Sequence, residues 1–189
     1  MEQVIVTHTD NTTLKLQSRE NRSTVTKLEQ NVDLLNSDTI SITVRSATKL
    51  NFYIGDKITI IGMDYTLNNP PREIKNSESD FTYDLEFEGV QYDLMRASYS
   101  VNVDTTTNEI QDLNGDALTG DIEMFLNVLI SNANRVFPDK WVLGIFPANT
   151  ETKTLTFSES DNCLSVLQAY AQRITTTPNL AYQLMPAQA

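Results

Sequence analysis

Three carboxylates on one predicted strand are the densest acidic set in this chain that could support chemistry. Asp84, Glu86 and Glu88 occupy alternate positions, so an extended backbone presents all three on one face. Alternate strand residues lie roughly 6.5–7 Å apart, a separation that a pair of glycosidase carboxylates can have. The alternative is a solvated strand face that hinders edge-to-edge aggregation. The sequence favours this second interpretation, because nothing else in it indicates a sugar cleft.

A second acidic segment has the spacing of a calcium loop. Asp112, Asn114 and Asp116 alternate, and Glu123 stands where such a loop places its bidentate carboxylate. The position of the sharp turn, however, holds Ala117 where glycine is needed, and no helical pattern precedes the segment. We therefore expect a polar turn into a helix and no metal site.

The chain has a single histidine, His8, and a single cysteine, Cys163, which are far apart in sequence. A zinc site needs several such ligands together, and a serine hydrolase would need His8 as its base and a Gly-x-Ser-x-Gly elbow, which is missing. His8 follows a strand-like run and is predicted to be a surface or edge histidine. Cys163 lies in an apolar helical pattern and is predicted to be a buried, unreactive thiol. The sequence thus predicts no catalytic residue, no metal, no cofactor and no enzyme.

The elements that would position these residues begin with a β-rich domain, which alternating hydrophobicity predicts for residues 1–103. The clearest strand places Phe81, Tyr83, Leu85 and Phe87 on one apolar face. A hairpin is expected to turn at residues 62–64, and the prolines at 70 and 71 end it because they donate no ladder hydrogen bond. Short strands at this spacing are typical of a small sandwich or barrel. The expected strands are residues 4–7, 14–16, 39–44, 57–61, 65–67 and 81–88.

The composition changes after residue 103. Residues 104–118 are rich in Asp, Asn, Thr and Gly and are predicted to be a linker, and residues 177–189 are predicted to be an irregular tail. Residues 119–176 between them are predicted to form a small α+β domain in the order helix, two strands, helix. The first helix would be capped by Thr119 and end near Val136, and the second would be capped by Ser160 or Asp161. The two strands of this small domain are expected at residues 141–146 and 152–157.

Charge and composition exclude several classes of partner. Of 189 residues, 40% are hydrophobic, which is enough for a core, and the net charge is −11. Such an acidic chain is repelled by nucleic-acid phosphates and by anionic membranes. The N-terminus lacks the basic and apolar regions of a signal peptide, so we expect synthesis in the cytoplasm.

The order of these elements resembles that of a known family. The elements in question are, in order, Tyr53-Ile54-Gly55-Asp56-Lys57-Ile58-Thr59, a hairpin through Gly62, the Pro70-Pro71 break and the alternating strand Phe81-Thr82-Tyr83-Asp84-Leu85-Glu86-Phe87-Glu88. This order resembles the N-terminal region of the tail hub proteins of bacteriophages and prophages, also labelled tail-associated or prophage endopeptidase tail proteins. Residues 126–136, Trp141, Lys153-Thr154-Leu155-Thr156-Phe157 and the helix with Cys163 are similar to the segment that follows it there.

The resemblance implies a fold and an assembly. The fold would be α+β and mainly β: a tail-tube-like β-barrel or sandwich, then the start of a small α+β domain. The function would be structural, joining the tail tube to the tip of the virion tail, with the tube, distal tail and tip proteins as partners. Hubs of this family are homotrimers with two tube-like domains in each chain. The second such domain is missing here, so this chain alone is expected to be a monomer or weakly associated. No catalytic residue is carried over, because the endopeptidase domains of some members lie further along the chain.

Two other functions stay open at this point. A receptor- or carbohydrate-binding module would present exposed aromatic platforms, whereas Phe81, Tyr83, Phe87 and Trp141 have the pattern of core residues. A hydrolase would need a cleft lined by Asp84, Glu86 and Glu88, with at least one carboxyl pKa raised.

Overall fold

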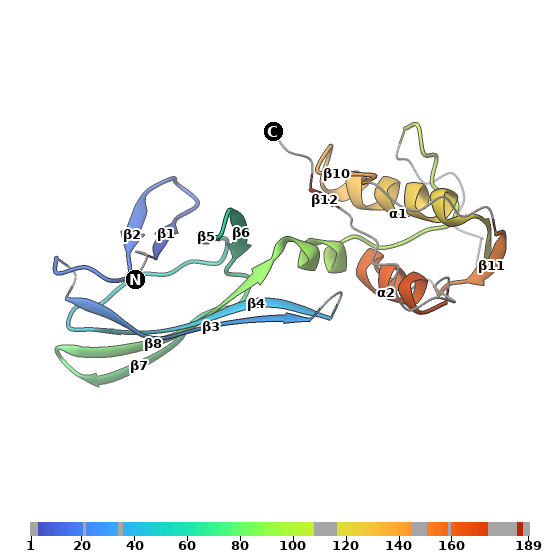
Figure 1. Cartoon of the computed structure of the whole chain (residues 1–189). Coiled ribbons are helices and arrows are strands. Elements are labelled where there is room, and N and C mark those ends of the chain that lie inside the picture. Colours follow the sequence, from blue (N-terminus) through green and yellow to red (C-terminus); the bar gives the residue numbers. More distant parts are fainter. Residues whose placement is uncertain are drawn as a thin grey trace. The chain divides into compact units, whose positions relative to one another are not determined.

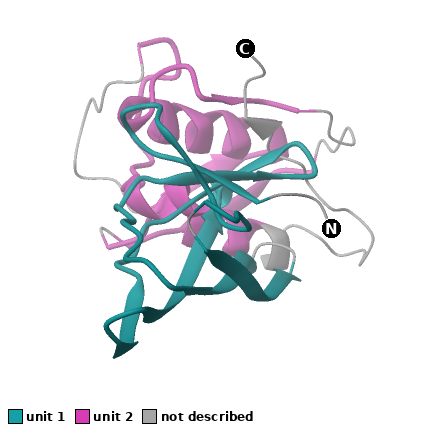
Figure 2. Ribbon diagram, turned by 90° about the vertical axis from the view of Figure 1, so that its left-hand side faces the viewer, with its two compact units in different colours: residues 1–91 teal, residues 92–189 magenta. Residues whose placement is uncertain are grey.

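The computed structural model describes residues 4–20, 22–33, 36–107, 117–144, 151–158, 160–173 and 185–186. The chain divides into two compact units, residues 1–91 and residues 92–189 (Figure 2). The domain limits expected from the sequence, 1–103 and 119–176, stay a prediction.

Strand β8 (Asp80–Gly89) is the centre of unit 1. Its apolar side chains alternate with polar ones, as the sequence predicts, and those at 81, 83, 85 and 87 are buried. Strand β4 (Ser37–Ser46) pairs with it antiparallel along almost its whole length, with Ile40 opposite Phe87 and Ile42 opposite Leu85. Because paired residues share a face, the two strands present one continuous apolar surface.

The remaining strands extend this pair into an open antiparallel sheet (Figure 1). The strand order is β2-β1-β5-β6-β8-β4-β3, and β7 also pairs with β8. This path ends at β2 and at β3, so the sheet is not the closed barrel that the sequence left open as one form of the fold. The fold class is α+β and mainly β, as predicted. The added strands are β1 (Ile5–Thr7), β2 (Thr13–Lys15), β3 (Ser23–Asp33), β5 (Lys57–Ile60), β6 (Met63–Thr66) and β7 (Arg72–Ser77).

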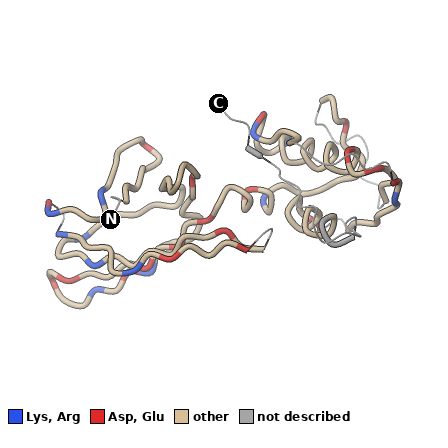
Figure 3. Tube along the Cα trace, in the orientation of Figure 1, with Lys and Arg blue, Asp and Glu red and all other residues tan. Residues whose placement is uncertain are grey.

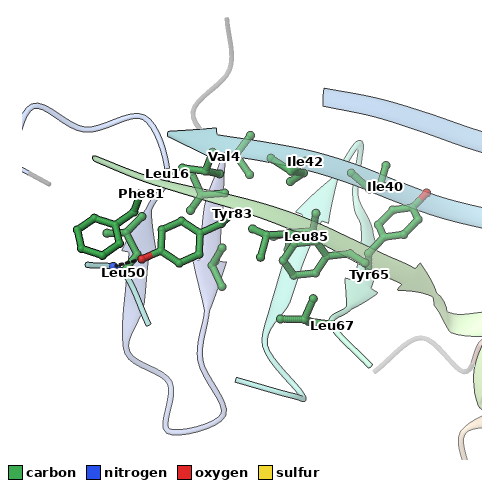
Figure 4. Packing of buried hydrophobic residues seen from close by; sticks show 14 residues of the cluster. Val4, Leu16, Ile40, Ile42, Leu50, Tyr65, Leu67, Phe81, Tyr83 and Leu85 are labelled. Carbon is green, nitrogen blue, oxygen red and sulfur yellow. Dashed lines mark hydrogen bonds between the residues drawn. The ribbon is translucent and has the colours of Figure 1, made fainter. Parts of the chain in front are cut away.

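The sheet branches at β8. Opposite β4, the first half of β8 pairs with β7 over residues 80–84, and its last two residues pair with β6. Pro70 and Pro71 lie in the connection between β6 and β7, where no ladder donor is required. The branch lets β1, β5 and β6 lie over the apolar face of β4 and β8, and side chains from both groups of strands meet in one core (Figure 4).

This core is apolar except for a few satisfied polar groups. The hydroxyl of Tyr83 accepts a hydrogen bond from the backbone N–H of Leu50 at 3.0 Å, which ties an irregular segment to the core. Tyr65 is fully buried, and its hydroxyl accepts from Nε2 of Gln30 on β3 at 2.9 Å. The fourteen buried members are Val4, Val6, Leu16, Ile40, Ile42, Val44, Leu50, Ile58, Tyr65, Leu67, Phe81, Tyr83, Leu85 and Phe87.

The β5–β6 hairpin turns one residue earlier than the sequence suggests. Ile60 pairs with Met63, so the turn consists of Ile61 and Gly62, whereas Met63 and Asp64 belong to β6. Both turn residues have positive φ, 51° at Ile61 and 75° at Gly62, which is the pattern of a type I′ turn. The expected turn at residues 62–64 was wrong because an isoleucine is an unusual choice for a left-handed turn position.

The described residues of unit 2 form two α-helices, most of a 3-10 helix and two short two-stranded ladders. Strands β9 and β11 pair antiparallel, as do β10 and β12. The predicted order of helix, two strands and helix is present, with β9 and β12 added. The elements are η1 (Val90–Arg96, which begins in unit 1), β9 (Ala117–Gly120), α1 (Ile122–Val136), β10 (Trp141–Val142), β11 (Lys153–Thr156), α2 (Cys163–Arg173) and β12 (Met185–Pro186).

Both helices begin at a cap other than the one expected. The N-cap of α1 is Asp121, not Thr119, and its carboxylate accepts from the Met124 N–H at 3.0 Å. Helix α2 follows Asn162, whose side-chain oxygen accepts from the Ser165 N–H at 2.9 Å, in place of Ser160 or Asp161. The apolar stripe of α1 is buried as predicted. It comprises Ile122, Phe125, Leu126, Leu129 and Ala133.

A buried asparagine fastens an irregular segment of unit 2 to α1. Oδ1 of Asn132 accepts from the Ser100 N–H at 3.0 Å, and its Nδ2 donates to the Ser100 carbonyl at 2.8 Å. The same Nδ2 donates to the Val128 carbonyl at 2.9 Å. Asn132 is fully buried, and buried polar groups of this kind are almost always hydrogen-bonded.

We expect Asn132→Ala to destabilise unit 2 by about 2 kcal/mol, because the Ser100 N–H and C=O would both lose their partner. Urea unfolding followed by tryptophan fluorescence would measure this, since Trp141 is the only tryptophan and lies in unit 2. Asn127→Ala, at a half-buried asparagine of the same helix, is the matched control. Equal effects of the two substitutions would contradict a specific role for the Ser100 contacts.

Candidate functional site

The acidic row on β8 is held by neighbouring side chains. Asp84 accepts from the hydroxyl of Thr43 at 2.9 Å, and Glu88 accepts from Nδ2 of Asn68 at 2.6 Å. Glu86 between them is exposed. Because β8 pairs on both sides, it is not an edge strand, and the interpretation of this row as protection of a sheet edge was wrong. Its residues are part of the polar face of a central strand.

The segment that resembles a calcium loop lies mostly outside the described residues, namely at Asp112, Asn114 and Asp116. Ala117 begins β9, and Glu123 is exposed in the first turn of α1. Within the part of the chain that the structure describes, no group of three or more His, Cys, Asp or Glu side chains could hold a metal ion.

The histidine lies beside a buried carboxylate that the sequence did not reveal. Nδ1 of His8 is 2.9 Å from Oδ1 of Asp56, an ion-pair distance without hydrogen-bond geometry. The His8 side chain is 14% exposed and that of Asp56 is fully buried. The other oxygen of Asp56 accepts from the Tyr53 N–H at 2.8 Å, and the rings of His8 and Tyr53 meet edge to face. His8, expected to be a surface or edge histidine, directly follows β1, and its side chain is mostly buried beside Asp56.

A carboxylate beside an imidazole supplies two of the three members of a hydrolase triad, so the presence or absence of a nucleophile decides what this pair can do. Among the described residues, Nδ1 of His8 has no hydrogen-bond partner. The pair instead joins the end of β1 to the loop before β5. Backbone hydrogen bonds tie the same loop to Leu67 after β6, with the Gly55 N–H donating to the Leu67 carbonyl at 2.8 Å and the Leu67 N–H to the Asp56 carbonyl at 2.8 Å.

We expect Asp56→Ala to destabilise unit 1 more than His8→Ala does. The first substitution leaves the Tyr53 N–H without its acceptor and costs about 2–3 kcal/mol, whereas water can reach the partly exposed position of His8. Urea unfolding of the two variants, followed by the circular dichroism of the β-sheet, would show which variant loses more free energy of unfolding. A larger loss of stability in His8→Ala would contradict this expectation. It would mean that the charge of Asp56, rather than its hydrogen bond to Tyr53, contributes most to the stability of unit 1.

The cysteine is in the core of unit 2, as predicted. Cys163 is fully buried, and burial raises the pKa of its thiol to about 12. Nearby, the hydroxyls of Tyr99 and Tyr170 hydrogen-bond to each other at 2.8 Å, and burial raises the pKa of both phenols above the ordinary value of 10.0. These groups remain neutral near pH 7. A neutral thiol is a poor nucleophile, so the surroundings of Cys163 are those of a structural residue.

The raised pKa values make unit 2 sensitive to base. An unfolded thiol ionises near 9.0, whereas the folded one stays neutral to about 12, so the free energy of unfolding should fall as the pH rises from 9 to 12. At pH 8, iodoacetamide should alkylate Cys163 only after a denaturant is added, which mass spectrometry would detect. Rapid alkylation of the folded protein would contradict the buried position.

Acidic and basic positions are interspersed over unit 1 (Figure 3). Within the described ranges, no helix is both long and apolar enough to cross a membrane. Two open depressions on unit 1 are lined by side chains that include Arg19, Arg22, Arg45 and Asp80.

Comparison with known proteins gives the fold a precedent. No family model matches the chain, and no curated protein matches its sequence. Among solved structures, it is similar to prophage tail protein gp18 from Listeria monocytogenes EGD-e, with a TM-score of 0.53 and 13% sequence identity. The chain has the fold of a prophage tail protein. The match covers 90% of this chain and 45% of that chain, so this chain spans less than half of its neighbour.

Proposed function

We propose that this chain is a structural component of a phage or prophage tail, at the tip or baseplate hub, where it joins the tail tube to the tip. The observation that carries the proposal is the match to prophage tail protein gp18, because it extends over 90% of the chain and includes both compact units. The order of motifs that resembles tail hub proteins supports it independently, since the sequence alone indicates that family.

The side chains that could do chemistry support a structural role. The thiol of Cys163 is buried, and the imidazole of His8 is engaged with Asp56. The acidic row on β8 is bound by Thr43 and Asn68. We therefore propose that the chain is not an enzyme and that it needs no cofactor.

A receptor- or carbohydrate-binding module receives no specific support. Such modules stack sugars on exposed aromatic rings. Phe81, Tyr83, Phe87 and Trp141 are all buried, so the aromatic side chains considered for such a platform are core residues.

The partners that follow from this proposal are other tail proteins, namely the tail tube, the distal tail protein and the tip. We propose that the complete hub is a homotrimer in the virion tail, assembled in the host cytoplasm. The chain by itself is expected to sediment as a monomer or a weak oligomer.

The decisive test is whether the chain is part of a tail. Particles would be induced from the encoding lysogen, purified on a density gradient and examined by quantitative mass spectrometry. We expect the chain in the tail-containing fractions at a fixed ratio to the tube protein. Particles from a strain with a deletion of the tube gene are the control and should lack it. Absence of the chain from intact tails would overturn the proposal.

A further inference from the structure

Strand β3 ends the sheet of unit 1 and leaves one of its own edges open (Figure 1). It is eleven residues long, and among the described strands it pairs only with β4. The backbone N–H and C=O groups on its other edge therefore meet no strand that the structure describes. A row of such donors and acceptors is a template on which a further strand can pair.

Only the second half of this edge is regular. A bulge interrupts the pairing of β3 with β4 between Val25 and Lys27, whereas residues 27–33 pair with β4 without a shift. A bulge bends and twists the strand that contains it, which hinders pairing along an edge. A further strand would therefore pair with residues 27–33, which we call the edge segment.

The edge segment carries apolar side chains that continue the buried face of the sheet. Leu28 lies opposite Ile42, and Gln30 lies opposite Ile40, and both isoleucines are buried. Because paired residues share a face, Leu28, Gln30 and Val32 are on the side of the core. Leu28 is nevertheless 44% exposed and Val32 is 62% exposed. The apolar face thus reaches the open edge, where the described residues leave it uncovered.

The edge segment is self-complementary when two copies of it lie antiparallel. If Gln30 lies opposite Gln30 of the partner subunit, Leu28 lies opposite the partner's Val32. In the same register, Lys27 lies opposite the partner's Asp33. The two-fold axis repeats each of these pairs. Apolar pairs and pairs of opposite charge across a ladder both stabilise a sheet.

The charges of the segment select this register. A shift by two residues in one direction would place Glu29 opposite the partner's Glu29, and a shift in the other direction would place it opposite the partner's Asp33. Like charges directly opposite each other destabilise a ladder. A pairing centred on Leu28 would run across the bulge. In the register centred on Gln30, by contrast, Glu29 faces the neutral Asn31.

The contacts that these charges make within the chain lie at the surface. Nζ of Lys27 is 2.8 Å from Oε2 of Glu29, and both side chains are more than half exposed. The carboxylate of Asp33 accepts from Nδ2 of Asn36 at 3.1 Å, also in an exposed position. Exposed ion pairs contribute little to stability, so turning Lys27 and Asp33 toward a partner costs little.

We propose that the open edge of β3 is a two-fold interface, in which the edge segment pairs antiparallel with the edge segment of a second copy of this chain. Each Leu28 then covers the partner's Val32, and the two sheets become continuous. A two-fold contact uses one patch twice, which is what a self-complementary segment provides. The inference concerns the free chain and does not rest on the proposed function. It narrows the weak association expected of this chain to a defined dimer.

Sedimentation velocity of the isolated full chain tests the interface. An interface of seven residues on each side is small, so we expect a monomer–dimer equilibrium with a Kd on the order of 10–100 µM. Lys27→Glu would place like charges opposite each other twice and should raise the Kd at least about tenfold, and Asp33→Lys should do the same. The double variant Lys27→Glu/Asp33→Lys exchanges the charges and should restore the Kd to within about threefold of the wild type. Such a restoration cannot come from misfolding.

Disulfide formation tests the register. Gln30→Cys puts a thiol at the two-fold axis, where directly opposed Cα atoms are about 4.5–5.5 Å apart, a separation that a disulfide can bridge. With oxidised glutathione we expect a covalent dimer. Thr24→Cys, at an exposed position of the same strand outside the edge segment, is the matched control and should remain monomeric. The native Cys163 does not interfere, because it is fully buried.

The other outcomes would each overturn the proposal. A chain that stays monomeric up to about 300 µM would refute a second copy as the partner and leave the tail function standing. A dimer that ignores both charge reversals, or that cross-links as well through Thr24→Cys, would place the contact elsewhere. A trimer would refute two-fold pairing. Cross-linking of position 30 in purified tails to a different protein only would assign the edge to that subunit.

Discussion

Unit 1 depends on β8, because this strand carries both the backbone pairing and the core. It pairs with β4 on one side and with β6 and β7 on the other. Its inward side chains pack in the core against side chains of β1, β5 and β6. Alternation with a period of two is what makes this double role possible. A shift of β8 by one residue would turn Tyr83 and Leu85 toward water and Asp84 into the core, so the register is strongly specified.

The elements that the sequence predicts are those with a strong apolar period. The strand at residues 81–88 and the stripe of α1 were recognised because burial on one face imposes a repeat on the sequence. Strands β3 and β7 were missed for the opposite reason. Most of their side chains are exposed, and ladder hydrogen bonds to one neighbour hold them without any apolar pattern. The caps Asp121 and Asn162 were displaced by one or two residues from those expected, because several capping residues occur near each helix start.

The candidate site residues, too, could be predicted only where the sequence around them has an apolar period. The burial of Cys163 could be predicted, since its neighbours repeat with helical spacing. The pairing of His8 with Asp56 could not, because it joins residues 48 positions apart through a loop that has no period. The best available signal was Gly55 before Asp56, which marks a turn that an aspartate can satisfy. Asp56, Asn132 and Tyr83 play the same structural role, since each binds the backbone of an irregular segment from a buried position. These three buried polar groups thus hold irregular segments in place.

The branch in the sheet has a mechanical consequence. On the side away from β4, β7 holds the beginning of β8 and β6 holds its end, and the paired positions skip residues 85–87. A force that pulls β7 from the sheet would therefore be borne by the ladder at residues 80–84 and would not unzip the β5–β6 hairpin. The ladder that holds β7 is thus separate from the one that holds β6.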